Sequence, residues 1–370
     1  MKILFTHHRY HTNLFNWFRG FQQNGHKVRL LVYKPDEVSQ PNLPKSTYLK
    51  PSKWSTKKMK SNPRTRGDGV DSFSPYYYPS IKTLYSYFKS EKPDLVVIRP
   101  AFSRFGYMVL FMALLFRSKV VFHSRIRIHR HYSKPKLILF KIALGLLNAY
   151  WMSPCKGNPE KYPLASKRLI YFPFLIEPEV NDRSYFKNGK VNILCVAKYF
   201  RSKNPEMMLR AFLELRKEYD DIKLTICGTG DREGEYYQNM MELTQGSNFS
   251  NDIELLINQP LERMRELYQS HDIFVLPTRH DPASFTVLEA MSFGLAVITT
   301  KVDGSSGYVI ENENGFIVSE KDIDELIKKL RDLISAKLKV TSYGKNSLFR
   351  VNEFHEPTVQ TQKFISSICK

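Results

Sequence analysis

The second half of the chain alternates strand-like and helix-like segments with a regularity that few folds accommodate. Apolar runs at 192–197, 223–227, 253–257, 273–277 and 295–300 are typical of buried strands. Helix-like segments lie at 205–218, 261–269, 285–293 and 321–335. Strands that alternate with helices form parallel sheets covered on both faces, so this half predicts a doubly wound α/β domain.

The first half shows the same alternation with one interruption. Strands are expected at 2–6, 28–33, 94–98, 119–123 and near 150–153, and helices at 13–23, 80–89, 107–116 and 136–147. Residues 35–80 break the pattern, because eight basic and no acidic side chains lie from Lys45 to Gly67 and three tyrosines follow between prolines. We interpret this stretch as a long loop or flexible insertion, basic from about residue 40 to 75. At 370 residues, the chain is long enough for two domains.

The net charge lies in the first half. The chain has a formal charge of +20, and residues 1–185 carry +22 whereas residues 186–370 carry −2. Such asymmetry suggests that one domain faces a polyanion, either an anionic membrane surface, a phosphorylated glycan or lipid acceptor, or nucleic acid. The cations around Trp54 favour a membrane surface. Because no nucleic-acid-binding motif is present, a non-enzymatic polyanion-binding protein is the least favoured hypothesis.

Several kinds of protein are disfavoured by what the sequence lacks. No apolar run reaches 18 residues, so no transmembrane helix is expected. The four cysteines (155, 195, 227 and 369) have no paired or metal-type spacing, which favours reduced thiols in a cytoplasmic protein. Five histidines (7, 8, 11, 129 and 131) lack the Cys or Asp that would complete a ligand pattern, so no metal site is expected.

Residues 277–300, PTRHDPASFTVLEAMSFGLAVITT, form a strand, a loop, a helix and a strand. Ser284 is a suitable N-cap for a helix over 285–293, and Gly294 stands where a C-terminal glycine is expected. Asp281 then lies before the helix and Glu289 about one turn inside it.

The start of this helix has the chemistry of a ligand site. The N–H groups of Phe285, Thr286 and Val287 should open toward whatever Asp281 faces. A helix N-terminus flanked by carboxylates suits a ligand that has both phosphates and hydroxyls, such as a nucleotide sugar.

The segment 288–298, LEAMSFGLAVI, resembles the second half of the retaining glycosyltransferases of family 4. This resemblance implies the GT-B fold, in which two doubly wound Rossmann-like domains face a central cleft. We accordingly expect an acceptor-binding domain over 1–180, a donor-binding domain over 181–355, and a C-terminal helix over 356–370 that returns to the first domain.

The resemblance also assigns roles to four charged residues. Lys198 and Lys203, in VAKYFRSKNP, match two family cations that bind the donor diphosphate. Asp281 matches a glutamate that contacts sugar hydroxyls, and Glu289 matches the glutamate that holds the ribose hydroxyls. Outside this context, the lysines would be ordinary surface residues and the carboxylates a loop aspartate and a helix-face glutamate.

Further positions are carried over with less support. Gly228 belongs to a glycine turn near the donor, and Asn258 lies in the loop that reads the base through backbone atoms. Ser284 takes the place of a family glycine, ahead of the backbone of Phe285 and Thr286. His123 matches a histidine near the transferred sugar, although a strand-end histidine held by a structural hydrogen bond is the alternative.

The chain also departs from the family pattern. Lysine replaces arginine at 198, asparagine replaces glycine at 204, and aspartate replaces glutamate at 281. The segment 303–307, DGSSG, lacks the first glycine and the glutamate of the family's Gly-Gly-x-x-Glu, and bulky residues at 7–10 replace a glycine-rich loop. The bulky residues at 7–10 suggest a specialised acceptor side, whereas the changes at 198, 281 and 303–307 bear on donor orientation, donor choice and the cleft.

The resemblance implies a retaining, metal-independent hexosyltransferase without a cofactor. The donor would be a nucleotide-diphosphate sugar, with UDP-sugar favoured, and the acceptor a hydroxyl of a cell-surface glycan or lipid-linked saccharide such as lipopolysaccharide. The enzyme would be peripheral on the inner face of the cytoplasmic membrane. Another GT-B reaction, by a sugar-nucleotide epimerase or a sugar-phosphate synthase, is the alternative.

Overall fold

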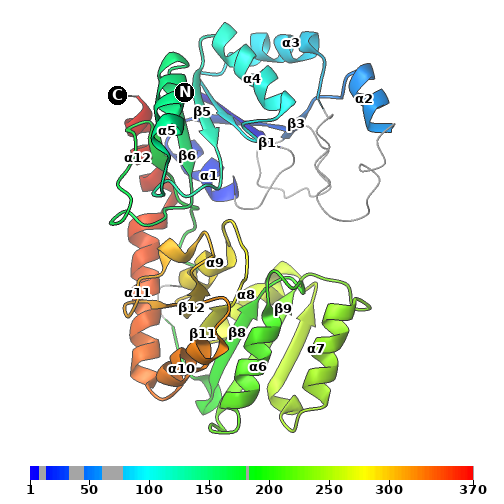
Figure 1. Cartoon of the computed structure of the whole chain (residues 1–370), viewed down its shortest axis with the longest axis vertical. Helices are drawn as coiled ribbons and strands as arrows, with labels where there is room; N and C mark the ends of the chain where they lie inside the picture. The colour runs from blue at the N-terminus through cyan, green and yellow to red at the C-terminus, as the bar shows by residue number, and fades with distance from the viewer. Residues whose placement is uncertain (8–13, 33–45, 61–77, 181–182, 370) are drawn as a thin grey trace. The chain divides into compact units, whose positions relative to one another are not determined.

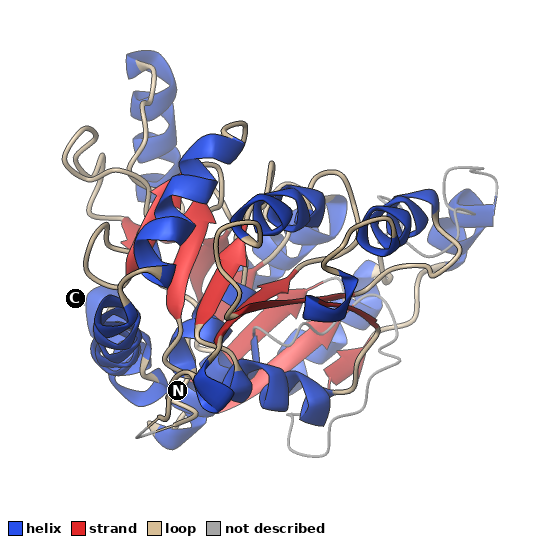
Figure 2. Ribbon diagram, turned by 90° about the horizontal axis from the view of Figure 1, so that it is seen from below, coloured by secondary structure: helices blue, strands red, loops and turns tan. Residues whose placement is uncertain are grey.

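The computed structural model describes the chain except for residues 8–13, 33–45, 61–77, 181–182 and 370. The chain divides into two compact units, Met1–Leu175 with Pro357–Lys370, and Ile176–Glu356. Each unit is built on one parallel sheet with helices on both sides of its strands (Figures 1 and 2). The predicted fold class, two doubly wound Rossmann-like α/β domains, is therefore confirmed.

Within the described residues of the first unit, seven strands form one sheet in the order β3-β2-β1-β4-β5-β6-β7. They are β1 (Lys2–His7), β2 (Lys27–Val32), β3 (Ser46–Tyr48), β4 (Leu95–Ile98), β5 (Lys119–His123), β6 (Ala149–Ser153) and β7 (Leu169–Tyr171). Each strand runs parallel to its neighbours. The central strands are apolar and buried on both faces, as parallel strands require.

Helices cover the two faces of this sheet. One face carries α1 (Phe15–Gln23) and α12 (Pro357–Ile368), which lie side by side in Figure 1. The rings of Phe21 and Phe364 meet there at 5.8 Å between centroids. A separate cluster of buried side chains includes residues of α3 (Ile81–Glu91), α4 (Arg104–Leu115) and α5 (Lys134–Leu146) together with residues of the strands. The last helix of the chain thus packs in the same core as the first.

The interpretation of residues 35–80 as a loop is wrong for its described part. Strand β3 pairs with β2, and α2 (Lys53–Lys60) follows it. Ser52 begins the helix, since its hydroxyl accepts from the N–H of Ser55 at 3.1 Å. The Trp54 ring packs against Tyr78 at 5.8 Å, so an aromatic contact outweighs the poor local pattern. The rest of the predicted insertion, at 40–45 and 61–75, lies outside the described residues.

Within the described residues of the second unit, six strands form a parallel sheet in the order β10-β9-β8-β11-β12-β13. They are β8 (Val191–Val196), β9 (Ile222–Gly228), β10 (Ile253–Ile257), β11 (Ile273–Leu276), β12 (Ala296–Thr300) and β13 (Gly315–Val318). The helices are α6 (Pro205–Leu215), α7 (Glu235–Gln245), α8 (Leu261–Ser270), α9 (Thr286–Ser292), α10 (Ile323–Ile334) and α11 (Lys337–His355). The strand order reverses between β8 and β11.

Two helices of this unit, α7 and α11, were not predicted from the sequence. Helix α7 contains polar residues among its two tyrosines and two methionines, and α11 contains Gly344 and several residues of weak helix propensity. Helix α11 packs on α9 and β12, so its helicity depends on tertiary contact. None of the described helices is long and apolar enough to cross a bilayer.

The contact between α1 and α12 can be tested at a glycine. A Cβ added at Gly20 would overlap the carbonyl oxygen of Pro357, whereas a Cβ at Gly145 in α5 would meet no atom within 4 Å. Gly20→Ala should therefore destabilise the first unit by about 1–3 kcal/mol, because backbone has to move. Gly145→Ala, the matched helical control, should be neutral or stabilise by about 0.5–1 kcal/mol. Urea unfolding of the full chain measures both, and equal stability of the two variants would contradict the packing.

Candidate functional site

The predicted site residues of the second unit follow the carboxyl ends of its strands. Lys198 follows β8, Gly228 ends β9, Asn258 follows β10, and Asp281 follows β11. Carboxyl ends of parallel strands meet at one edge of the sheet, and ligands of open α/β sheets bind at that edge where the strand order reverses. Residues 60 or more positions apart in the sequence are in this way brought to one place.

An ion pair joins two of these residues. The Nζ of Lys203 lies 2.5 Å from Oδ2 of Asp281, and both side chains are largely buried. The other carboxylate oxygen of Asp281 accepts from the N–H of Ala283 at 3.1 Å. The two loops are also joined by backbone, since the N–H of Arg279 donates to the carbonyl of Ser202 at 2.9 Å. The cation and the carboxylate are therefore held in a fixed geometry before any ligand arrives.

Lys198 stands differently. Its side chain is exposed, and it forms no ion pair with any described residue. The neighbouring departure from the family has a structural explanation, because Asn204 has φ of 55°. Asparagine tolerates this left-handed region better than most residues, and its side-chain amide also donates to the carbonyl of Pro277 at 3.2 Å. The loop that carries Lys203 thus keeps its turn without glycine.

The buried carboxyl of Asp303 lies next to Asp281 and helps to hold its loop in place. Asp303 accepts from the N–H of Ser305 at 2.9 Å and from the hydroxyl of Thr299 at 2.9 Å. Burial raises the pKa of Asp303 to about 7, with a contribution from the charge of Asp281. The N–H of Gly304 donates to the carbonyl of Asp281 at 2.9 Å. The sequence analysis noted that segment 303–307 departs from the family pattern. It did not predict that Asp303 contacts the loop that carries Asp281.

The start of α9 corrects a prediction. The helix spans Thr286–Ser292, and its N-cap position is Phe285, not Ser284. The hydroxyl of Ser284 instead pairs with that of Thr286 at 2.9 Å, and its carbonyl accepts from the hydroxyl of Ser305 at 2.6 Å. Contacts with the 303–305 segment outweigh the local capping preference. With seven residues, α9 has fewer than two turns, so its dipole contributes less than a longer helix would.

Glu289 lies in the first turn of α9, as predicted, and has a partner that the sequence did not reveal. The hydroxyl of Tyr268, in α8, donates to Oε2 of Glu289 at 3.0 Å. The Tyr268 ring is stacked on Phe293, with centroids 5.4 Å apart. Burial raises the pKa of Glu289 to about 7, the hydrogen bond from Tyr268 opposes this rise, and the charge of Glu179 adds to it. The carboxyl therefore titrates near neutral pH.

Gly228 and Asn258 shape the backbone of the same edge. A Cβ at Gly228 would overlap the carbonyl oxygen of Ala197, so glycine is required where β8 and β9 end. Asn258 has φ of 53°, and its side-chain amide donates to the carbonyl of Gly230 at 3.1 Å. The two residues fix the turn that follows β9.

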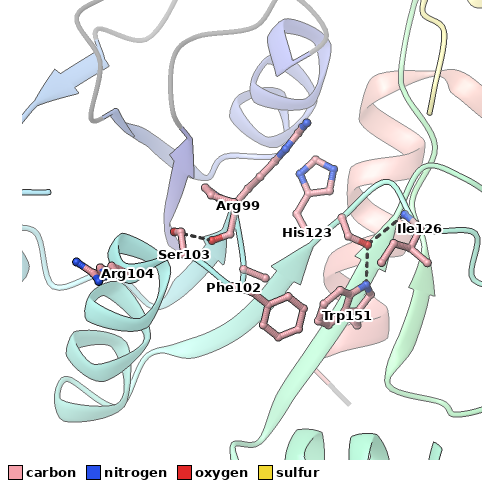
Figure 3. A pocket seen from close by; sticks show the side chains of 10 residues that line it. Arg99, Phe102, Ser103, Arg104, His123, Ile126 and Trp151 are labelled. Atoms are coloured by element: carbon pink, nitrogen blue, oxygen red, sulfur yellow. Dashed lines mark hydrogen bonds between the residues drawn. The ribbon is translucent and has the colours of Figure 1, made fainter. Parts of the chain in front are cut away.

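His123 belongs to the first unit, where it ends β5 and lines a cavity of about 450 Å³ (Figure 3). Its Nε2 is buried without a hydrogen-bond partner in the described structure. Burial lowers the pKa of the imidazole well below its usual value, and the charges of Arg99 and Arg125 lower it further. The neutral ring therefore lies in the wall of the cavity, and its buried Nε2 has no hydrogen-bond partner among the described residues.

The cavity around His123 combines aromatic walls with positive charge. The rings of Phe102 and Trp151 lie 5.5 Å apart in its wall, and Figure 3 shows them next to one another, below His123 in that view. Arg99 and Arg104 also line it. The lining residues come from β5, from β6 and from the segment that follows β4, so no single sequence motif predicts the cavity. An aromatic wall with arginines suits a ligand that has apolar faces and an anionic group.

Comparison with known proteins identifies a family match in the second unit. Residues 178–348 match the family described as Glycosyl transferases group 1. An uncharacterized glycosyltransferase of Haemophilus influenzae is 31% identical over 147 residues, which cover 39% of each chain. A D-inositol 3-phosphate glycosyltransferase of Corynebacterium urealyticum is 28% identical over 143 residues, or 38% of this chain and 34% of that one. The matched segments therefore span about a third to two fifths of these relatives.

The fold of the whole chain is similar to that of solved glycosyltransferases. The crystal structure of Anabaena Alr3699/HepE in complex with UDP superposes with a TM-score of 0.71. The alignment covers 100% of both chains at 12% sequence identity. This likeness shows the GT-B architecture of the chain.

The raised pKa of Glu289 has a measurable consequence. Below about pH 4.5 the carboxyl is neutral in both the folded and the unfolded protein, so it does not affect folding. As the pH rises from about 4.5 to about 7, the unfolded protein ionises the carboxyl more readily than the folded one, and the folded protein loses stability. Glu289→Gln keeps an acceptor for Tyr268 and removes the charge. The variant should be as stable as the parent near pH 4.5 and more stable by about 1–3 kcal/mol at pH 8. If the free energy of unfolding of the parent and of Glu289→Gln changed equally between about pH 4.5 and pH 8, the raised pKa of Glu289 would be contradicted.

Proposed function

We propose that this chain is a retaining hexosyltransferase, because residues 178–348 match the glycosyl transferases group 1 family and the chain has the GT-B fold. Its donor is a nucleotide-diphosphate sugar, and its acceptor is a hydroxyl of a cell-surface glycan or a lipid-linked saccharide. The observation that carries the proposal is the group formed by Lys203 and Asp281, with Lys198 and Glu289 at the same edge of the second sheet.

In the proposed complex, each charged residue contacts a different part of the donor. Lys198 and Lys203 bind the diphosphate, each with a charge-assisted hydrogen bond that contributes about 1.5–3 kcal/mol. Glu289 accepts from the ribose hydroxyls, and Asp281 accepts from hydroxyls of the transferred sugar while it stays paired with Lys203. We favour a UDP-sugar, since HepE, which has the same fold, was crystallised with UDP.

The reaction needs the leaving diphosphate to gain negative charge as the glycosidic bond breaks. Lys198 and Lys203 stabilise that charge, and Lys203 does so from a position fixed by Asp281, which makes the stabilisation more effective. The acceptor hydroxyl then attacks the oxocarbenium-like carbon from the face that the diphosphate leaves, and a diphosphate oxygen takes the hydroxyl proton. This course requires no nucleophile from the protein, no metal and no other cofactor. The two-carboxylate arrangement of glycosidases does not apply, because Glu289 is assigned to the ribose.

We assign the acceptor to the first unit. His123 has a neutral ring and lies in the wall of the aromatic cavity, so we place it near the transferred sugar. The first 185 residues carry a charge of +22, which favours an anionic acceptor and a peripheral position on the inner face of the cytoplasmic membrane. Nucleic acid is not proposed as a partner.

Two substitutions test the donor site. Lys203→Ala and Glu289→Ala should each lower kcat/KM for transfer by about tenfold or more, because each removes a contact worth about 1.5 kcal/mol or more. Lys223→Ala is the matched control, since Lys223 is exposed near the amino end of β9, away from the site edge. It should leave transfer unchanged.

The measurement combines binding with turnover. Thermal shift against UDP-, GDP-, ADP- and TDP-sugars should show one stabilising nucleotide, with the shift lost in Glu289→Ala. Product analysis with and without an acceptor extract then separates a transferase from an epimerase or a sugar-phosphate synthase, which need no glycan acceptor. Full activity in either site variant would refute the site assignment.

A further inference from the structure

Helix α5 presents an apolar face to solvent. Of its residues, Leu144 is the one classed as buried. Ile138, Leu139, Ile142 and Leu146 are exposed, with Leu139 at 70% and Leu146 at 83% of full exposure. At about 100° per residue, these four side chains fall within one arc of about 100° on the helix. The apolar stripe therefore faces away from the sheet that α5 covers.

Helix α4 has the same character. Its buried side, which includes Phe105, Val109 and Met112, packs in the core of the first unit. Its outer side carries Tyr107, Phe111, Leu114 and Leu115, all exposed, and Arg104 is the charged residue of the helix. Exposed apolar residues that lie singly are ordinary, whereas two helices with apolar outer faces mark an interaction surface.

The two helices lie in one layer. They connect β4 to β5 and β5 to β6, which are consecutive parallel strands of the sheet. Consecutive crossovers of this kind are right-handed, so both helices cover the same face. Residues of both helices belong to one core cluster, and Figure 1 shows the helices on the strands that they join. We call the exposed side chains of α4 and α5 the α4–α5 face.

The charges around this face have one sign. The sequence has no Asp or Glu between Asp94 and Glu160. Lys134, Lys136 and Lys141 of α5 are exposed beside the apolar stripe. A second copy of the chain on this face would bring the like charges of two copies together, which is unfavourable. Apolar side chains flanked by lysines match a surface that is apolar within and anionic at its boundary.

We propose that the α4–α5 face docks on a bilayer that contains anionic lipids. The apolar side chains enter the boundary between headgroups and acyl chains, and the lysines contact lipid phosphates. The proposal deepens the proposed function, on which it rests for the lipid-linked acceptor. Phe102 and Ile126 are exposed and also line the His123 cavity, so apolar surface continues from the start of α4 to the mouth of that cavity.

This surface differs from the one that the basic segment after residue 40 suggested. Trp54 of α2 is half exposed, but its ring packs on Tyr78 and lies beneath the cations of Lys58 and Arg104. The ring is therefore held on the protein. The α4–α5 face has more exposed apolar side chains than α2, and no aromatic or cation contact of this kind is seen over them in the described structure.

The test is sedimentation of the full-length protein with vesicles. Phosphatidylcholine vesicles are compared with vesicles that also contain phosphatidylglycerol. The parent should bind the anionic vesicles. The double variant Leu139→Gln, Leu146→Gln should lower its partition coefficient by about tenfold or more. The triple variant Lys134→Gln, Lys136→Gln, Lys141→Gln should do the same, and added salt should weaken binding of the parent.

Leu338→Gln is the matched control, because Leu338 in α11 of the second unit is 88% exposed and apolar. It should bind vesicles as the parent does. Equal binding of the parent, the double variant and the control would overturn the proposal. So would a parent dimer, seen by analytical ultracentrifugation without lipid, that becomes monomeric in the double variant. The thermal shift with nucleotide sugar should be the same in all of these proteins, so its loss would instead count against the proposed function.

Discussion

A buried carboxylate, Asp272, holds together the two strands on which the candidate donor site depends. Its oxygens accept from the N–H groups of Phe186 and Asn192, each at 2.8 Å, at the amino edge where β8 and β11 begin. Burial raises the pKa of Asp272, and these hydrogen bonds oppose the rise, so the charge is stabilised by fixed backbone dipoles. Because β8 and β11 are rigid and parallel, fixing their beginnings also fixes their ends. The loops that carry Lys203 and Asp281 therefore meet at the opposite edge, where the strand order reverses.

The donor-site residues differ in how their charges are compensated, and this difference assigns their chemistry. Lys203 and Asp281 neutralise one another, so the site can desolvate both without a large cost. Lys198 has no ion-pair partner among the described residues, and in the proposed complex it adds a positive charge beside the diphosphate. Glu289, which is partly buried, and Asp303, which is fully buried, have pKa values raised to about 7 and are held by hydroxyl or backbone donors. The edge of the sheet thus holds both the acceptors that sugar hydroxyls need and the cations that phosphates need.

The sequence predicted those parts of the structure that local pattern determines. Buried apolar runs separated by helical segments predicted the inner strands of both parallel sheets, whereas the edge strands β3, β7 and β13 were not predicted. The local pattern at 277–300 predicted that Asp281 lies before α9 and Glu289 inside it, as the structure has them. Local capping rules misplaced the start of α9, since Ser284 is held by the buried 303–305 segment. The partner of Glu289, Tyr268, lies 21 residues away on another helix, and no spacing rule connects them. Helix α11 and the pair β3 and α2 were missed because tertiary packing, not propensity, makes them regular.

The contrast between the two units shows that the charge asymmetry is organised in space. In the second unit, acids and bases are paired on the surface, as in Arg331 with Glu218 and Lys337 with Asp221. In the first unit, the lysines of α5 stand beside exposed leucines and isoleucines, and the sequence around them supplies no acid to pair with. A surface of that kind lowers solubility in water, because apolar area is left exposed and like charges repel. An anionic bilayer removes both costs at once, since it covers the apolar side chains and neutralises the lysines.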